Sequence, residues 1–247
     1  MEGFLLINKP AGMTSFNCVR QIRKIVGKSF KVGHAGTLDH FATGLLIIGI
    51  GRQATKLLGR LLQMPKTYFG TGKLGQLTDT YDPAGRIIVT NHKSVNKSDL
   101  QEALKSFEKG YLQTPPVYSA LKFQGQRLSD LQRVTELADE VHKIAISKQR
   151  YVNLYSLELK SFEYPYFTIE SQVSSGTYIR ALINDIAIKL DNCATTVQLN
   201  RLAIGPFLSA DGLDLSELNL DLIKSKLIPV NELLSRLDSY DLNIKLL

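Results

Sequence analysis

The chain has 247 residues, of which 44% are hydrophobic and 21% charged, and it carries a formal net charge of +7. This length can bury a substantial core as one large domain or as one domain with a small appendage. No apolar run is long enough for a membrane span, and the first residues lack the basic segment and apolar core of a signal peptide. We therefore expect a cytoplasmic protein with no membrane contact.

Cysteine and histidine are sparse and widely spaced. Cys18 and Cys193 share no close-spaced motif, and the four histidines offer no metal-ligand spacing. We expect buried free thiols and no metal site. The positive net charge favours an anionic partner such as nucleic acid.

The amino-terminal residues predict a strand, a turn and a helix. Residues 4–7 are typical of a short buried strand, and a turn around Pro10 follows. Thr14 or Ser15 can cap a helix that extends to Val26, because apolar residues recur there at helical spacing. Arginine and lysine side chains between them give this helix a basic face.

The stretch from Gly33 to Gly44 predicts a loop, because it combines three glycines and two threonines with no sustained period. Asp39 at its centre is the only acidic residue between Gly3 and Thr78, a segment with eleven lysines and arginines. A carboxylate would repel the phosphates that such a segment attracts. Its presence therefore indicates chemistry. The alternative is that Asp39 caps the following turn or neutralises one neighbour.

The chain continues as a mixture of strands and helices. A strand and a helix meet at Gly49 and Gly51, a spacing that also occurs in dinucleotide sites. No acidic residue follows before Asp79, so we interpret these glycines as a tight turn. Further strands are predicted at 66–74, 86–90, 144–147, 151–162 and 166–173.

Arg180 departs from the rule for helix ends. Thr177 can cap a helix that follows it, and Arg180 lies in the first turn, where the helix dipole favours anions rather than cations. Departures of this kind are expected at functional sites. A nearby carboxylate would relieve the conflict, and Asp39 is our candidate; the alternative is an arginine extended into solvent.

Several motifs in this order resemble the TruB-type tRNA pseudouridine synthases, and they span most of residues 4–208. The matching segments are LINKPAGMTS (6–15), GHAGTLD (33–39), ATGLL (42–46), KTY (66–68), LGQLTDT (74–80), PPVYSALK (115–122) and SGTYIR (175–180). One departure is His40, which stands where the family usually has proline.

The resemblance implies an α+β (mixed) fold of the pseudouridine synthase type, with a largely antiparallel central sheet flanked by helices. We expect a catalytic domain over residues 1–209, with a thumb-like insertion at about 113–143. Residues 210–247 carry seven acidic and four basic residues, which indicates a short accessory segment outside the basic surface.

The same resemblance implies that the protein is an isomerase. It would flip one uridine out of the TΨC loop of tRNA, position 55, and convert it to pseudouridine, with no metal or organic cofactor and no protein partner, as a monomer. Asp39 occupies the place of the catalytic aspartate. The residues expected at the substrate are Tyr68, which stacks on the uracil; Arg180, which pairs with the aspartate; His34, which holds the flipped nucleotide; Tyr178 and Leu199, which line the pocket; and Lys9.

Three alternatives stay open at this point. One is a non-catalytic tRNA-binding protein or RNA chaperone on the same fold. Another is an enzyme addressed by a guide RNA and protein partners. A dinucleotide-dependent oxidoreductase is the most distant.

Overall fold

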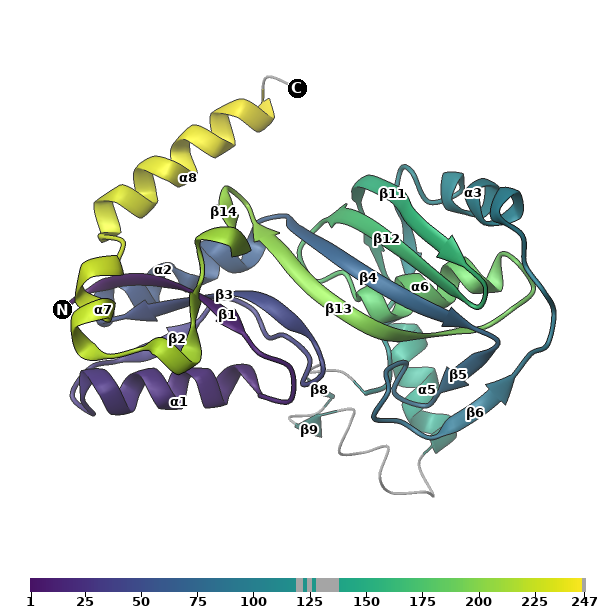
Figure 1. Cartoon of the computed structure of the whole chain (residues 1–247), viewed down its shortest axis with the longest axis horizontal. Coiled ribbons are helices and arrows are strands. Elements are labelled where there is room, and N and C mark those ends of the chain that lie inside the picture. The colour runs from purple at the N-terminus through teal and green to yellow at the C-terminus, as the bar shows by residue number, and fades with distance from the viewer. Residues whose placement is uncertain (119–121, 124–125, 128–137, 246–247) are drawn as a thin grey trace. The chain divides into compact units, whose positions relative to one another are not determined.

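The computed structural model describes residues 1–118, 122–123, 126–127 and 138–245 (Figure 1). The chain forms two compact units: unit 1 comprises residues 1–68 and 199–247, and unit 2 comprises residues 69–198. It passes from unit 1 to unit 2 within β4 (Lys66–Leu74) and returns within β13 (Ala194–Ile204). Much of the insertion predicted at 113–143 lies outside the described residues, and the predicted domain boundaries stay predictions.

Unit 1 contains a sheet in the order β13-β3-β1-β15, in which β1 and β3 run antiparallel over their whole length. Its elements are β1 (Gly3–Lys9), α1 (Ser15–Val26), β2 (Val32–His34), β3 (Thr43–Ile50), α2 (Arg52–Gln63), β14 (Phe207–Leu208), η2 (Ser209–Asp211), β15 (Leu213–Asp214), η3 (Leu215–Glu217), α7 (Leu220–Lys226) and α8 (Val230–Lys245). The hydroxyl of Thr14 caps α1 by accepting from the Asn17 N–H.

Helices cover both faces of the β1–β3 pair, so these strands are apolar on both sides (Figure 1). Every side chain from Phe4 to Ile7 and from Leu45 to Ile48 is buried. Since successive side chains of a strand point to opposite faces, one set packs with α2 and α8 and the other with α1 and α7. The continuous apolar runs in the sequence reflect this double coverage.

Unit 2 contains the strand order β11-β12-β4-β13 and three two-stranded ribbons. Its elements besides β4 and β13 are β5 (Gln76–Thr78), β6 (Ile87–Thr90), α3 (Lys97–Lys105), β7 (Tyr111–Gln113), β8 (Lys122–Phe123), β9 (Gln126–Arg127), α5 (Ala138–Ser147), β10 (Arg150–Val152), β11 (Leu154–Glu163), β12 (Tyr166–Val173) and α6 (Ile179–Ile188). Helix α6 is buried along most of its length. The ribbon of β7 and β10 pairs Gln113 with Arg150.

The α+β class with a mostly antiparallel sheet is confirmed. Cys18 and Cys193 are free and buried, as expected. Within the described ranges, no group of three or more metal-ligating side chains comes together and no helix has the length and apolarity to cross a membrane.

Three local predictions are wrong. The loop expected from Gly33 to Gly44 is shorter, because β2 and β3 take up its two ends; β2 forms only by pairing with β3, which no local pattern reveals. Residues 144–147 are the last turn of α5 rather than a strand, since a short apolar run such as Ile144 to Ile146 fits either structure. Thr177 does not cap α6, because its hydroxyl donates to the Ser174 carbonyl instead.

Gly44 lets β3 approach β13 closely, and this close approach can be tested. It has a φ of +102°, and a Cβ there would overlap the Asn200 amide and the Arg201 backbone. We expect Gly44→Ala to lower the free energy of unfolding by about 3 kcal/mol or more. Gly59, in α2, has open space around it, and Gly59→Ala should raise stability by up to about 1 kcal/mol. Urea unfolding of both variants checks this; equal effects would contradict it.

Candidate active site

Asp39 lies half-buried in the loop between β2 and β3. The preceding residue is fixed by the buried Ser15, whose hydroxyl accepts from the Leu38 N–H at 2.9 Å and donates to the Leu38 carbonyl at 3.4 Å. The Asp39 carbonyl accepts from the Ala42 N–H at 3.2 Å. The backbone on both sides of the carboxylate is therefore tied down.

Lys9 fastens this loop to the turn between β1 and α1. Its side chain is 1% exposed, and its ammonium group donates to the carbonyls of Pro10 and Met13 at 2.8 Å and of His40 at 3.4 Å. The Gly12 N–H donates to the same His40 carbonyl at 2.9 Å. Two donors thus hold the backbone where the sequence has histidine in place of proline. Lys9 remains a predicted substrate-binding residue, but here its protons serve the turn.

The charge of Lys9 interacts with other charged groups of the site. Burial lowers the pKa of Lys9, the nearby charges of Cys18 and Asp39 raise it, and the Arg201 cation lowers it further. Lys9 therefore interacts electrostatically with both Asp39 and the Arg201 cation.

Sequence reasoning missed Arg201, a buried residue of β13. It is 1% exposed, and it donates to the Leu45 carbonyl at 2.8 Å and to the Gly36 carbonyl at 3.1 Å. Arg201 therefore joins β3 to the start of the loop that carries Asp39. The available signal was its spacing from Leu199, because residues two apart in a strand share a face.

His34, in β2, has a ring Nδ1 that is buried without a hydrogen-bond partner among the described residues. Burial lowers the pKa of His34, the Arg201 cation lowers it further, and a hydrogen bond with the Gly36 backbone partly offsets both. The imidazole is therefore neutral at pH 7.

Tyr68 is the last residue of unit 1 before β4 enters unit 2, and Leu199 is the first residue of unit 1 after β13 leaves unit 2. Tyr68, in β4, is half-buried, while Leu199, in β13, is 6% exposed. Two residues before Tyr68, Lys66 anchors β4 to the end of α2 by donating to the Met64 carbonyl at 2.6 Å. Burial and the Arg201 cation lower the pKa of Lys66 to about 8.

Arg180, in unit 2, is not extended into solvent. Its side chain is 5% exposed and forms an ion pair with Asp82 at 3.3 Å. It also donates to the Tyr118 carbonyl at 3.0 Å and to the Thr80 carbonyl. Sequence reasoning missed Asp82, and this carboxylate relieves the cation at the helix end. The pairing with Asp39 stays a prediction.

Tyr178 precedes α6 and is held by Gln113, which sequence reasoning also missed. The Tyr178 N–H donates to the Gln113 side chain at 2.8 Å, and the Tyr178 carbonyl accepts from it at 3.1 Å. The Arg150 guanidinium lies 5.8 Å from the centre of the Tyr178 ring. Both the backbone and the ring of this expected pocket residue are thus contacted from the β7–β10 ribbon.

Asp185, farther along α6, accepts from the Tyr111 hydroxyl at 2.6 Å. Burial raises the pKa of Asp185 to about 6, and the bond from Tyr111 partly offsets that rise. Burial and the adjacent carboxylate raise the pKa of Tyr111, so the phenol keeps its proton. At pH 7 the pair is an ionised carboxylate and a neutral donor.

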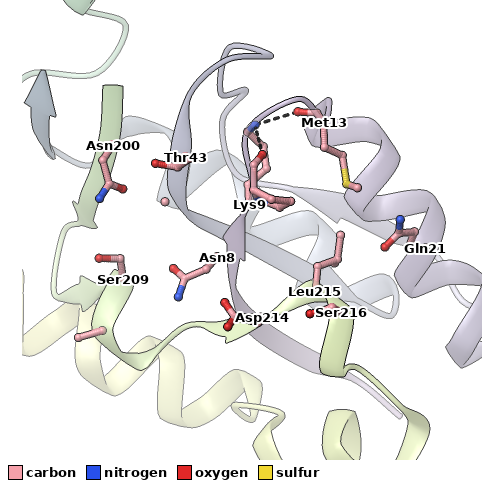
Figure 2. A pocket seen from close by; sticks show the side chains of 13 residues that line it. Asn8, Lys9, Met13, Gln21, Thr43, Asn200, Ser209, Asp214, Leu215 and Ser216 are labelled. Atoms are coloured by element: carbon pink, nitrogen blue, oxygen red, sulfur yellow. Dashed lines mark hydrogen bonds between the residues drawn. The ribbon is translucent and has the colours of Figure 1, made fainter. Parts of the chain in front are cut away.

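A groove of about 630 Å³ opens in unit 1 beside the β1–α1 turn (Figure 2). Its lining includes the polar side chains of Asn8, Thr43, Asn200 and Asp214. Figure 2 shows the Lys9 ammonium bonded to the turn carbonyls. The groove adjoins the loop of Asp39 through Thr43, and part of its lining comes from the motifs at 6–15 and 42–46.

Comparison with known proteins shows the family of this chain. The model of the TruB family pseudouridylate synthase N-terminal domain matches residues 23–179. A tRNA pseudouridine synthase B of Clostridium kluyveri is 40% identical over 95% of this chain and 78% of its own length. The human pseudouridylate synthase TRUB1 is 34% identical over 84% of this chain and 62% of its own length.

Among solved structures, one chain of a crystal structure of a Cbf5-Nop10-Gar1 complex matches with a TM-score of 0.66 and 28% identity. The match covers 87% of this chain and 53% of that chain, so the present chain spans about half of its length. The fold and the matched motifs define a pseudouridylate synthase. The chain belongs to the TruB family.

The raised pKa of Asp185 predicts a pH-dependent effect of Asp185→Asn. A carboxyl group whose pKa rises from 3.8 to about 6 on folding stabilises the folded state below pH 3.8 and loses that contribution as the pH rises to 6. Asp185→Asn should therefore be more favourable at about pH 7.5 than at about pH 4.5, by about 2 kcal/mol.

Urea unfolding at both pH values measures this difference, and comparing one variant at two pH values cancels the packing cost of the substitution. The exposed Asp99 in α3 provides the control, since Asp99→Asn should show the same effect at both pH values. A pH-independent effect of Asp185→Asn would contradict the assignment.

Proposed function

We propose that this protein converts one uridine of the TΨC loop of tRNA, position 55, to pseudouridine, with Asp39 as the catalytic group. The observation that carries the proposal is the Asp39 loop, a carboxylate on a fixed backbone in a basic segment. Membership of the TruB family and relatives named tRNA pseudouridine synthase B support the substrate. Family membership also disfavours a dinucleotide-dependent oxidoreductase.

The reaction is an isomerisation. The bond between the ribose C1′ and the uracil N1 breaks, a bond between C1′ and C5 forms, and the C5 proton leaves as N1 gains one. No oxidant, reductant or group donor is consumed, which agrees with the proposal of no cofactor. Whether Asp39 attacks the ribose, attacks the base or removes a sugar proton is left open by the chemistry of a carboxylate alone.

Base flipping gives the remaining residues their proposed roles. A base inside a folded RNA loop must leave the stack at a cost of a few kcal/mol, and stacking on an aromatic ring offsets that cost. We assign this stacking to Tyr68. His34 would hold the flipped nucleotide, Tyr178 and Leu199 would line the pocket, and Arg180 would pair with Asp39. Lys9 would contribute through the loop it anchors.

Phosphate contacts are proposed for the exposed face of α1. Arg20, Arg23 and Lys24 are exposed on this helix, and the neighbouring Phe16 is 64% exposed. Cations beside an exposed ring are typical of surfaces that bind RNA. We propose that the isolated chain, as a cytoplasmic monomer without a protein partner, binds and modifies tRNA in this way.

Asp39→Asn is the direct test. The substitution removes the negative charge but keeps the shape, so pseudouridine formation should fall at least about 1,000-fold while tRNA affinity changes less than about threefold. Purified protein is incubated with an unmodified TΨC stem-loop, and carbodiimide-reactive pseudouridine is measured alongside binding. Asp221→Asn, an exposed carboxylate of α7, is the control and should behave like the wild type.

Each outcome separates the alternatives. Retained turnover in Asp39→Asn would refute the role of Asp39. An inactive wild-type chain that still binds the stem-loop would favour a non-catalytic RNA-binding protein. Activity that appears only with added guide RNA or protein partners would favour the guided class.

A further inference from the structure

We propose that Gln113 is a positioning residue for Tyr178 and that the β7–β10 ribbon acts as a clamp on this tyrosine. The inference rests on the proposed function, in which Tyr178 lines the uridine pocket. All residues that carry it belong to unit 2.

Gln113 binds the backbone of Tyr178 at both of its polar groups. Its Oε1 accepts from the Tyr178 N–H at 2.8 Å, and its Nε2 donates to the Tyr178 carbonyl at 3.1 Å. A carboxamide places an acceptor beside a donor, so it matches one residue's N–H and C=O in a way that a carboxylate or hydroxyl does not. The side chain is 1% exposed, which keeps water from competing.

This contact differs from an ordinary helix cap. The first N–H groups of a helix usually bond to a nearby serine, threonine, aspartate or asparagine side chain. Tyr178 stands at the cap position of α6 without such a bond. Gln113, 65 residues earlier in the chain, instead binds the N–H of Tyr178 itself. The position of Tyr178 thus depends on where β7 lies.

Tyr111 and Asp185 fix the orientation of the Gln113 amide. Its Nε2 also donates to the Tyr111 hydroxyl oxygen at 2.6 Å, and that hydroxyl donates to Asp185 at 2.6 Å. Because the hydroxyl proton is engaged by the carboxylate, its oxygen faces the amide as an acceptor, and a flipped amide would lose this bond. Tyr111 and Gln113, alternate residues of β7, thereby bind α6 at Asp185 and bind Tyr178, the residue that precedes this helix.

Arg150 completes the clamp from the second strand. It lies directly opposite Gln113 in the ribbon, and its guanidinium approaches the Tyr178 ring at 5.8 Å. Gly176 leaves room for it, since a Cβ at that residue, where φ is +79°, would overlap the guanidinium. One cross-strand pair therefore contacts both the backbone and the ring of Tyr178.

Gln113→Met tests the inference, because it keeps the length of the side chain and removes every polar contact. We expect kcat on the TΨC stem-loop to fall about 30- to 100-fold, since a small displacement of a positioned group is costly, while the Kd for the stem-loop stays within about threefold. Gln149→Met is the control. Gln149 adjoins β10 and is exposed, and its side-chain amide donates to the Thr114 hydroxyl, so its substitution should leave kcat unchanged.

Gln113→Glu adds a pH signature that a merely structural role would not produce. A protonated carboxyl group presents an acceptor and a donor like the amide, whereas the carboxylate presents acceptors only. The kcat of Gln113→Glu relative to the wild type should therefore rise as the pH is lowered from about 8 to about 5.5. If Gln113→Met does not fold, this variant and Arg150→Met, with an expected fall in kcat of about threefold to tenfold, carry the test.

The inference is overturned if folded Gln113 variants keep the wild-type kcat, or if kcat and melting temperature fall together with no pH dependence in Gln113→Glu. Its failure is distinguishable from failure of the proposed function. If only this inference fails, the wild-type chain still forms pseudouridine in the same assay. If the proposed function fails, the wild-type chain forms none.

Discussion

The site in unit 1 depends on the attachment of one loop to one turn. Lys9 and Ser15, which flank the turn between β1 and α1, bind the backbone on either side of Asp39. Buried bonds of this kind are strong because water cannot compete for them, and leaving any one unmade would be costly. The carboxylate therefore has a fixed backbone while its side chain stays half exposed.

That attachment is built from groups that are expensive to bury. Lys9 and Arg201 are each 1% exposed, and their cations donate mainly to backbone carbonyls. Desolvation of a charge opposes folding, and carbonyl groups offset it only when the geometry is good. Apolar side chains at these two positions would avoid this cost. The Arg201 cation also adds to the effect of burial in lowering the pKa of His34, and it lowers the pKa of Lys9.

Unit 2 likewise places charged groups largely out of contact with water, at the start of α6 and farther along it. Arg180 is buried against Asp82, and Asp185 is buried with Tyr111 as its donor. Each of these ionised groups reduces stability unless its partners are in place. In both units, buried charged groups that reduce stability hold short backbone segments in place. Enzymes commonly have such arrangements around reacting groups.

The sequence by itself determined the elements whose signals are local. Several features are readable along the chain, because each depends on neighbours within a few residues. They are the apolar runs of β1 and β3, the Thr14 cap of α1, the isolation of Asp39 among cations and the misplaced charge of Arg180. The motifs, in their order along the chain, also indicated the family. Only the tertiary structure decided that β2 forms on β3, that Arg201 reaches Gly36, that Asp82 meets Arg180 and that Gln113 holds Tyr178. These contacts join residues far apart in sequence, and a glutamine or an arginine has the same local pattern whether it faces water or a distant backbone.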